Sequence, residues 1–177
     1  MTRIADHRAI LGLDPSSRGL AFVFFENGAL LDWGTRRDDG NELAVFDRLL
    51  DFCKADVVIL EDPDALRCER RARMRRLLRL MARHARERGV SVLAISRHEV
   101  RKQWLSRGTT RKYGVAAAIG AMFPEIEPLV PRRRKSYRSE EARAEIFDAV
   151  SLVLQACSLE PEAREDEATD RSPRAST

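Results

Sequence analysis

Short apolar runs and amphipathic segments alternate along most of the chain. The first three apolar runs follow one another with only short turns between them: residues 8–14, 20–26 and 28–35. Runs of this length, with a turn at Glu26-Asn27-Gly28, predict antiparallel strands joined as a meander. Two later apolar runs predict a fourth and a fifth strand: residues 57–60 and 90–95.

Apolar residues recur at helical spacing in the segments between and after these strands. In the first such segment the repeat is clear, with apolar residues at 43, 46, 49, 50 and 53. The predicted helices cover residues 42–53, 66–88, 98–105, 111–122 and 139–158. The helix at 66–88 carries ten arginines beside its Met and Leu stripe. Such a face is either an exposed charged surface or a nucleic-acid contact.

The order of these elements predicts an α/β fold with a five-stranded mixed sheet flanked by helices. Right-handed crossovers place the fourth strand parallel to the first, which gives the strand order 3-2-1-4-5. In that order the sheet changes its direction of growth between the first and fourth strands. Such a switch point opens a crevice at the carboxyl ends of the strands.

Two carboxylates come at the ends of the two strands that meet at this point. Asp14 follows the run Ile10-Leu-Gly-Leu13, and Glu61 follows Val57-Val-Ile-Leu60. Neighbouring strands lie about 4.8 Å apart, so the two acids can share one ligand shell. Carboxylates this close repel unless a cation lies between them, and Mg²⁺ prefers such oxygen ligands. Each acid taken alone is equally compatible with a loop or turn position.

The last predicted helix offers further acids on the face away from its apolar stripe. Asp148 lies nearly opposite that stripe, in line with Glu141 and Gln155. Glu145 lies about 60° around the helix from Asp148. A polar stripe of this kind is compatible with a solvent-exposed face as well as with a metal site.

Several segments together resemble the RuvC-type Holliday junction resolvases of the RNase H-like nuclease superfamily, over roughly residues 8–157. The opening ILGLDPSSRGLAFVFFENGALLDWGT is similar to the family's first strands, and VVILED is similar to the strand that carries its second acid. RERGVSVLAISRHEVRKQW and TTRKYGVAAAIGAMF resemble later segments, and EIFDAV resembles the closing motif. The aromatic residue that often follows the family's second acid is missing here, because Asp62-Pro63 follows Glu61.

The resemblance implies an RNase H-like fold and an Mg²⁺-dependent endonuclease that hydrolyses DNA phosphodiesters with two metal ions, Mn²⁺ being a substitute. It implies a catalytic and metal-binding set of four acids: Asp14, Glu61, Glu145 and Asp148. Glu141 is the alternative to Glu145 as the fourth ligand. The implied partner is branched DNA in the form of a four-way junction. A homodimer through the helix at 66–88 is also implied, although its arginines differ from the Gly- and Ala-rich sequence usual in the family.

Basic residues predict where nucleic-acid phosphates bind, because Lys and Arg neutralise phosphate charge irrespective of base sequence. One group precedes the acidic helix directly: Arg132, Arg133, Arg134, Lys135 and Arg138. A second group lies between residues 101 and 112: Lys102, Arg111 and Lys112. Trp104 lies among these charges and is suited either to base stacking or to core packing.

Composition and charge narrow the class of protein. The chain has 177 residues, 44% of them hydrophobic, and a net charge of +4. We expect one nuclease domain at residues 1–158 and a disordered acidic tail at 159–177, where six acids face three arginines. Three widely spaced cysteines predict reduced thiols. No apolar run is long enough to span a membrane, and the first residues do not have the apolar core of a signal peptide. These features predict a cytoplasmic protein.

Three other functions fit part of this pattern. An RNA-processing nuclease of the same fold would use the same metal chemistry, since that chemistry does not read the sugar. A nucleic-acid-binding protein without turnover would keep the fold, although the presence of all four acids argues against it. A nucleotide-binding domain of the actin and sugar-kinase type also opens with an Asp-bearing strand, but it needs a second similar domain, for which this chain is too short.

Overall fold

The computed structural model describes residues 8–37, 40–109, 111–131 and 143–159. Its five strands form one mixed sheet in the order β3-β2-β1-β4-β5, as predicted. β1 pairs antiparallel with β2 and parallel with β4, and β5 is parallel to β4. The strand bounds are β1 Ala9–Ser16, β2 Gly19–Glu26, β3 Ala29–Arg36, β4 Val57–Glu61 and β5 Ser91–Ile95.

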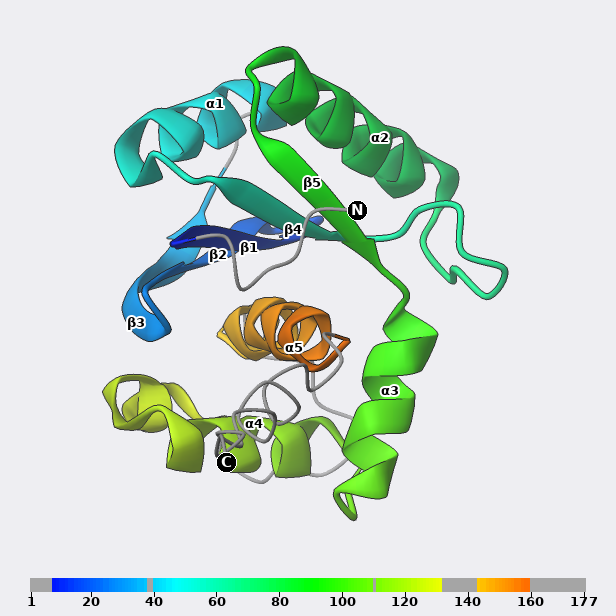
Figure 1. Ribbon diagram of the computed structural model, residues 1–177. Coiled ribbons are helices and arrows are strands. Elements are labelled where there is room, and N and C mark those ends of the chain that lie inside the picture. The colour runs from blue at the N-terminus through cyan, green and yellow to red at the C-terminus, as the bar shows by residue number, and fades with distance from the viewer. Residues whose placement is uncertain (1–7, 38–39, 110, 132–142, 160–177) are drawn as a thin grey trace, which may run out of the picture.

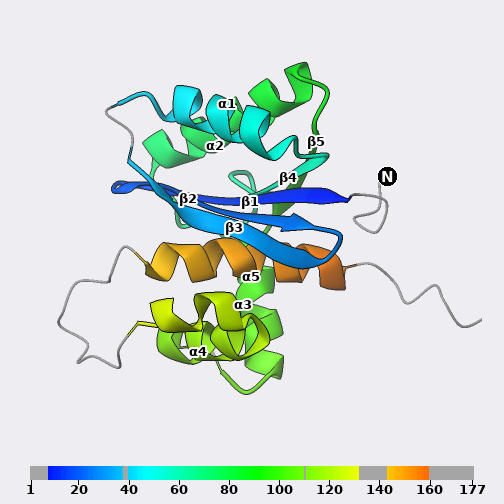
Figure 2. The ribbon, with the colours of Figure 1, turned by 90° about the vertical axis from the view of Figure 1, so that its left-hand side faces the viewer.

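Helices cover both faces of this sheet (Figure 1). One face carries α1 and α2, and the other carries α5, with α3 and α4 packed beyond it (Figure 2). The bounds are α1 Glu42–Cys53, α2 Ala72–Glu87, α3 Arg97–Ser106, α4 Lys112–Met122 and α5 Ala144–Ser158, with a 3-10 helix, η2, at Pro124–Leu129. None of the helices in the described ranges is long and apolar enough to cross a bilayer.

The largest departure from the sequence prediction is the start of α2. The helix begins at Ala72 rather than at Leu66, and residues 62–71 form a loop between β4 and α2. The amphipathic pattern predicted a helix here, but the side chain of Arg70 turns back to the ends of β1 and β4 and holds this segment out of the helix. Residues 139–142 of the last predicted helix and residues 160–177 of the acidic tail lie outside the described residues.

Alternate residues of β1 and β4 face opposite helical layers. Leu11 and Leu13 pack with α1 and α2, whereas Ile10, Val57 and Ile59 pack in the core that contains α5. By the same alternation Asp14 and Glu61 belong to the α5 face. The sheet therefore points both strand-end acids toward the helix that carries the other acids.

The α5 helix lies between the sheet and the α3 and α4 layer, so it is buried on most of its surface. Glu145 and Gln155 are each 6% exposed, and Ser151 is 3% exposed. The solvent-exposed alternative for the polar stripe is therefore wrong at these positions. Local periodicity could not reveal this, because the covering layer comes from other segments of the chain.

Gly12 on β1 allows α5 to lie this close to the sheet. A Cβ atom at this position would lie 2.4 Å from Val153 Cγ2, 2.9 Å from Val23 Cγ2 and 3.2 Å from the carbonyl oxygen of Ala149. We expect Gly12→Ala to lower the free energy of unfolding by about 1–3 kcal/mol, because well-packed cores resist added volume. Urea unfolding followed by circular dichroism measures this.

The matched control for Gly12→Ala is Ala94→Val, which adds volume at an exposed position of β5. This variant should unfold within about 0.5 kcal/mol of the parent. Equal stability of Gly12→Ala and the parent would contradict the close approach of α5 to β1.

Candidate functional site

The two strand-end acids lie side by side because their strands pair in register. Gly12 of β1 is paired with Ile59 of β4, and Asp14 and Glu61 each come two residues further along. Both side chains are buried, with residue exposures of 2% and 1%. The two acids therefore lie together at the carboxyl ends of adjacent parallel strands, as the sequence predicted.

One guanidinium joins these two acids to a third acid, Asp148 of α5. Arg97 Nη2 lies 2.9 Å from Asp14 Oδ1, and Arg97 Nε lies 2.9 Å from Glu61 Oε2. Arg97 Nη1 lies 3.5 Å from Asp148 Oδ2. Arg97 is the first residue of α3, and only Ser96 separates it from the end of β5. The three acids, from β1, β4 and α5, are thus gathered around a single cationic side chain.

A second guanidinium binds the same two strand-end acids. Arg70 Nε donates to Glu61 Oε2 at 2.7 Å, and Arg70 Nη2 contacts Asp14 Oδ1. Its remaining nitrogen, Nη1, donates to the carbonyl oxygen of Pro15 at 3.1 Å. Arg70 belongs to the 62–71 segment, so that segment is tied to the end of β1 through its side chain.

Burial and charge act in opposite directions on these groups. Burial raises the pKa of Asp14 to about 6, although Arg97 and Arg70 both lower it. Burial alone would lower the pKa of Arg97, but Asp14, Asp148 and Glu61 raise it above its ordinary value. The pKa of Arg70 is likewise raised, because Asp14 and Glu61 outweigh its burial and the charge of Arg97. Both arginines therefore stay charged.

Glu145 lies on the same helix as Asp148 but has a different partner. Its Oε1 is 3.2 Å from Arg18 Nε, in the turn between β1 and β2. Its Oε2 is buried and accepts no hydrogen bond from any residue in the described ranges. Glu141, the alternative to Glu145 as a ligand, lies outside the described residues.

The donor set suits a hard divalent cation, since all the acids present carboxylate oxygens and Glu145 Oε2 has no hydrogen-bond partner among the described residues. In the part of the chain that the structure describes, however, no three His, Cys, Asp or Glu side chains stand as a ready metal-binding group. The guanidiniums of Arg70 and Arg97 bind Asp14 and Glu61 instead. The residues fit a cation chemically, but these oxygens already have cationic partners.

One of the predicted basic residues, at the start of α4, lies beside Asp148. Lys112 Nζ lies 3.8 Å from Asp148 Oδ2, and its side chain is 55% exposed. Lys102 on α3 and Arg111 before α4 are exposed. The group that precedes α5 lies outside the described residues: Arg132, Arg133, Arg134, Lys135 and Arg138.

Trp104 belongs to the core and is unavailable for base stacking. It is 2% exposed, and its indole N–H donates to Ser151 Oγ at 3.2 Å. The core-packing alternative is therefore confirmed for this residue.

A cavity of about 630 Å³ lies beside Glu145, between β3 and the start of α5. Three arginines line it, and Trp33 contributes an aromatic ring. The arginines are Arg18, Arg37 and Arg143. Arg18 also pairs with Glu145, which connects this basic cavity to the acidic helix.

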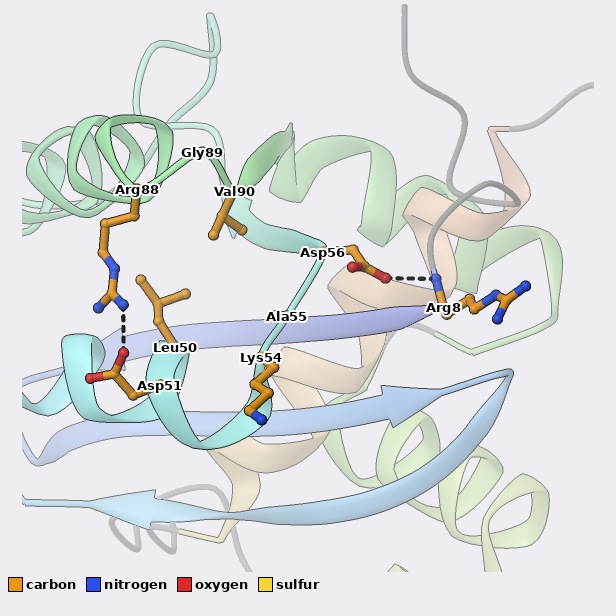
Figure 3. A pocket seen from close by; sticks show the side chains of 9 residues that line it. All are labelled: Arg8, Leu50, Asp51, Lys54, Ala55, Asp56, Arg88, Gly89 and Val90. Carbon is orange, nitrogen blue, oxygen red and sulfur yellow. Dashed lines mark hydrogen bonds and ion pairs between the residues drawn. The ribbon is translucent and has the colours of Figure 1, made fainter.

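A larger cavity, of about 820 Å³, lies at the other end of the parallel strands, where β1, β4 and β5 begin (Figure 3). Its charged groups are largely paired with one another or with the backbone. Asp56 accepts from the backbone N–H groups of Arg8 and Ala9, and Arg88 is paired with Asp51. The two acids that line this cavity, Asp51 and Asp56, thus have separate partners and do not converge as Asp14, Glu61 and Asp148 do.

Sequence reasoning missed Arg70 and Arg97 as members of the site. Arginine side chains are long and are common on surfaces, so residue type alone did not distinguish these two from their neighbours. A signal for Arg97 was present in its position, because it comes just after the carboxyl end of β5, whereas Asp14 and Glu61 lie at the carboxyl ends of the parallel strands β1 and β4. Arg70 carried no comparable signal, since the pattern around it predicted a helix.

A mixed sheet of this order, with strand-end acids facing a buried acidic helix, defines an RNase H-like fold. Comparison with solved structures supports a RuvC-like fold for this chain. It matches the Thermus thermophilus RuvC structure with a TM-score of 0.53 and 18% identity, over 83% of this chain and 92% of that chain. It matches T. thermophilus RuvC in complex with Holliday junction substrate with the same score and identity, over 84% and 92%. No family model and no curated protein matches the sequence.

Proposed function

We propose that this protein is a metal-dependent endonuclease that hydrolyses a phosphodiester bond in branched DNA. The observation that carries the proposal is the convergence of Asp14, Glu61 and Asp148 around one point, at the carboxyl ends of adjacent parallel strands. The RuvC-like fold supports it, since one T. thermophilus RuvC structure holds a Holliday junction substrate.

The roles of the residues follow from their chemistry. The ligands that would hold two Mg²⁺ or Mn²⁺ ions are the carboxylates of Asp14, Glu61, Asp148 and Glu145. Divalent cations bound there supply Lewis-acid stabilisation of the phosphate and a water nucleophile at neutral pH. Burial of Asp14 and Glu61 reduces solvent screening around them, which would strengthen their attraction for a bound cation. Lys112 lies at the exposed rim of the site, where its ammonium group can bind a phosphate.

The acids and the arginine-lined cavity together define a path for nucleic acid. Arg18 contacts Glu145 and also lines that cavity with Arg37 and Arg143. A strand whose scissile phosphate lies at the acids would place neighbouring phosphates beside these guanidiniums. Trp33 in the same cavity offers a ring on which a base can stack.

A second candidate function is nucleic-acid binding without turnover. The specific observation in its favour is the pairing of Arg70 and Arg97 with Asp14 and Glu61, which satisfies these carboxylates without a metal. Such a protein would bind branched DNA through its basic residues and leave it intact.

A substrate panel tests the proposed function. Labelled four-way junction, linear duplex and structured RNA are incubated with the protein in Mg²⁺ and, separately, in chelator. Cleavage of the junction in Mg²⁺ alone is the expected result. Cleavage of RNA alone would favour the RNA-processing nuclease. A protein that binds the junction but cleaves none of the substrates, with or without Mg²⁺, would favour nucleic-acid binding without turnover.

The basic group before α5 is expected to hold phosphates. Reversing the charge of Arg132, Arg133 and Arg134 to Glu should weaken junction binding and lower the slope of log affinity against log salt by about 1 to 3, since each phosphate contact adds about 0.9. Fluorescence anisotropy at several salt concentrations measures both.

The matched control makes the same charge change on the other side of the sheet, at exposed positions of α2: Arg76, Arg83 and Arg86. Its salt slope should stay near that of the parent. If the triple variant before α5 binds as the parent does, this segment does not hold the phosphates. A contribution of α2 to binding, or to a homodimer, would appear as a change in the control.

A further inference from the structure

Two positive side chains lie among the three converging acids. Arg70 and Arg97 both bind Asp14 Oδ1 and Glu61 Oε2, so each of these oxygens has two guanidinium partners. Exposed fractions of 21% and 23% show that the two side chains are mostly enclosed. Most arginine pairs elsewhere, such as Arg101 with Glu69, are exposed on the surface. The enclosed pair therefore differs from ordinary surface ion pairs.

The charges of this cluster balance as they stand. Asp14, Glu61 and Asp148 carry three negative charges, which Arg70, Arg97 and Lys112 match. A divalent cation added to this set would leave an excess of two positive charges in a buried place, which is unfavourable. A divalent cation that replaced both guanidiniums would keep the balance, because it carries the same charge as the pair.

We propose that Arg97 and Arg70 are internal counter-cations of the acid cluster, which a divalent cation must displace in order to bind Asp14 and Glu61. This inference rests on the proposed function and adds a competition to it. The carboxylate oxygens that a cation would take are the oxygens that the guanidiniums hold. Metal affinity is therefore set by the two arginines as well as by the acids.

The two arginines differ in how easily they can leave. Arg70 lies in the loop at 62–71, and residues on both sides of it belong to no helix or strand. Arg97 begins α3 one residue after β5, so its backbone is fixed by both elements. Arg70 is thus the first to be displaced, and Arg97 moves by side-chain rotation alone.

A displaced guanidinium needs a new anion, and a nucleic-acid phosphate at the acids is the nearest anion that the proposed function supplies. Arginine binds phosphate through paired N–H donors as it binds carboxylate. Phosphate binding and metal binding would then favour the same arrangement of Arg70 and Arg97. Each ligand should increase the affinity for the other.

Mn²⁺ titration followed by electron paramagnetic resonance tests the competition without any cleavage. We expect Arg97→Gln to bind Mn²⁺ about tenfold more tightly than the parent, since it removes a positive charge a few ångströms from the ligands. Arg70→Gln should shift the affinity in the same direction. Arg101→Gln is the matched control, because it removes a charge from the same helix but from the exposed pair with Glu69, and it should stay within about twofold of the parent.

Asp14→Asn is made in the parent and in the Arg97→Gln variant to identify the Mn²⁺ binding that depends on the acid cluster. It should abolish tight Mn²⁺ binding in both proteins. If Asp14→Asn removes Mn²⁺ binding but Arg97→Gln and Arg70→Gln leave the affinity unchanged or weaker, the competition is wrong while the proposed function stands. If no variant shows Mn²⁺ binding that depends on Asp14, both fail.

The unmodified protein gives a second readout that does not depend on the folding of variants. In ¹⁵N spectra the Arg70 and Arg97 Nε–H groups, which bind Glu61, should show slowed exchange with water. Addition of Mg²⁺ should move both resonances and speed their exchange. Resonances that stay unchanged at saturating Mg²⁺ would overturn the displacement.

Discussion

Asp14→Asn is expected to lower the rate of junction cleavage by at least about a thousandfold, and to leave junction affinity within about threefold of the parent. Asparagine keeps the shape of the side chain but removes the charge that a divalent cation needs. Binding should persist because it depends on basic residues away from β1. Single-turnover cleavage and fluorescence anisotropy on the same junction measure the two effects.

Asp51→Asn is the control for this prediction, because Asp51 is an exposed carboxylate on α1 that pairs with Arg88 on the other face of the sheet. Its cleavage rate should match that of the parent. A cleavage rate for Asp14→Asn that equals the control would remove Asp14 from the catalytic set. A loss of binding that parallels the loss of cleavage would instead point to a misfolded variant.

Arg97→Gln is expected to lower the free energy of unfolding by about 3–5 kcal/mol in metal-free buffer, because it leaves buried carboxylates without their main counter-charge. Arg101→Gln, which breaks an exposed pair with Glu69, should cost about 0–1 kcal/mol. Urea unfolding of both variants beside the parent measures the difference. Equal stability of the two variants would show that Arg97 is not needed to balance the acids.

The effect of Arg97→Gln should also depend on pH, through Asp14. The folded pKa of Asp14, about 6, lies above its ordinary value of 3.8, so the folded state binds a proton more tightly than the unfolded state does. Stability from this group is therefore present at low pH and is lost as pH rises between those values. Arg97 lowers the pKa of Asp14, so its removal should raise that pKa further and extend the loss to higher pH. The stability difference from the parent should be larger at pH 8 than at pH 5.

The parts of the fold that local sequence determines were predictable. Short apolar runs and turn residues predicted the five strands, and the short hairpins together with the right-handed crossover predicted their order. The same reasoning put Asp14 and Glu61 at one edge, because strand register carries both acids the same distance beyond Gly12 and Ile59.

The parts that depend on contacts between distant segments were not predictable. The polar stripe of α5 was compatible with a solvent-exposed face, yet Glu145 and Gln155 in it are buried, and α3 and α4 pack against this helix. The 62–71 segment was expected to be helical in part, but Arg70 binds two acids, Glu61 and Asp14, that lie 9 and 56 positions earlier in the chain. Periodicity within a segment cannot report either contact.

The proposed function requires that Asp14, Glu61 and Asp148 bind divalent cations together. Crystals of the protein soaked in Mn²⁺ test this most directly, because anomalous scattering locates manganese without reference to activity. We predict an anomalous peak about 2.0–2.4 Å from oxygens of Asp14 and at least one other of these acids, with the Arg97 guanidinium turned away from them. Crystals that show no such peak at saturating Mn²⁺, with both arginines still paired to Asp14 and Glu61, would contradict the account.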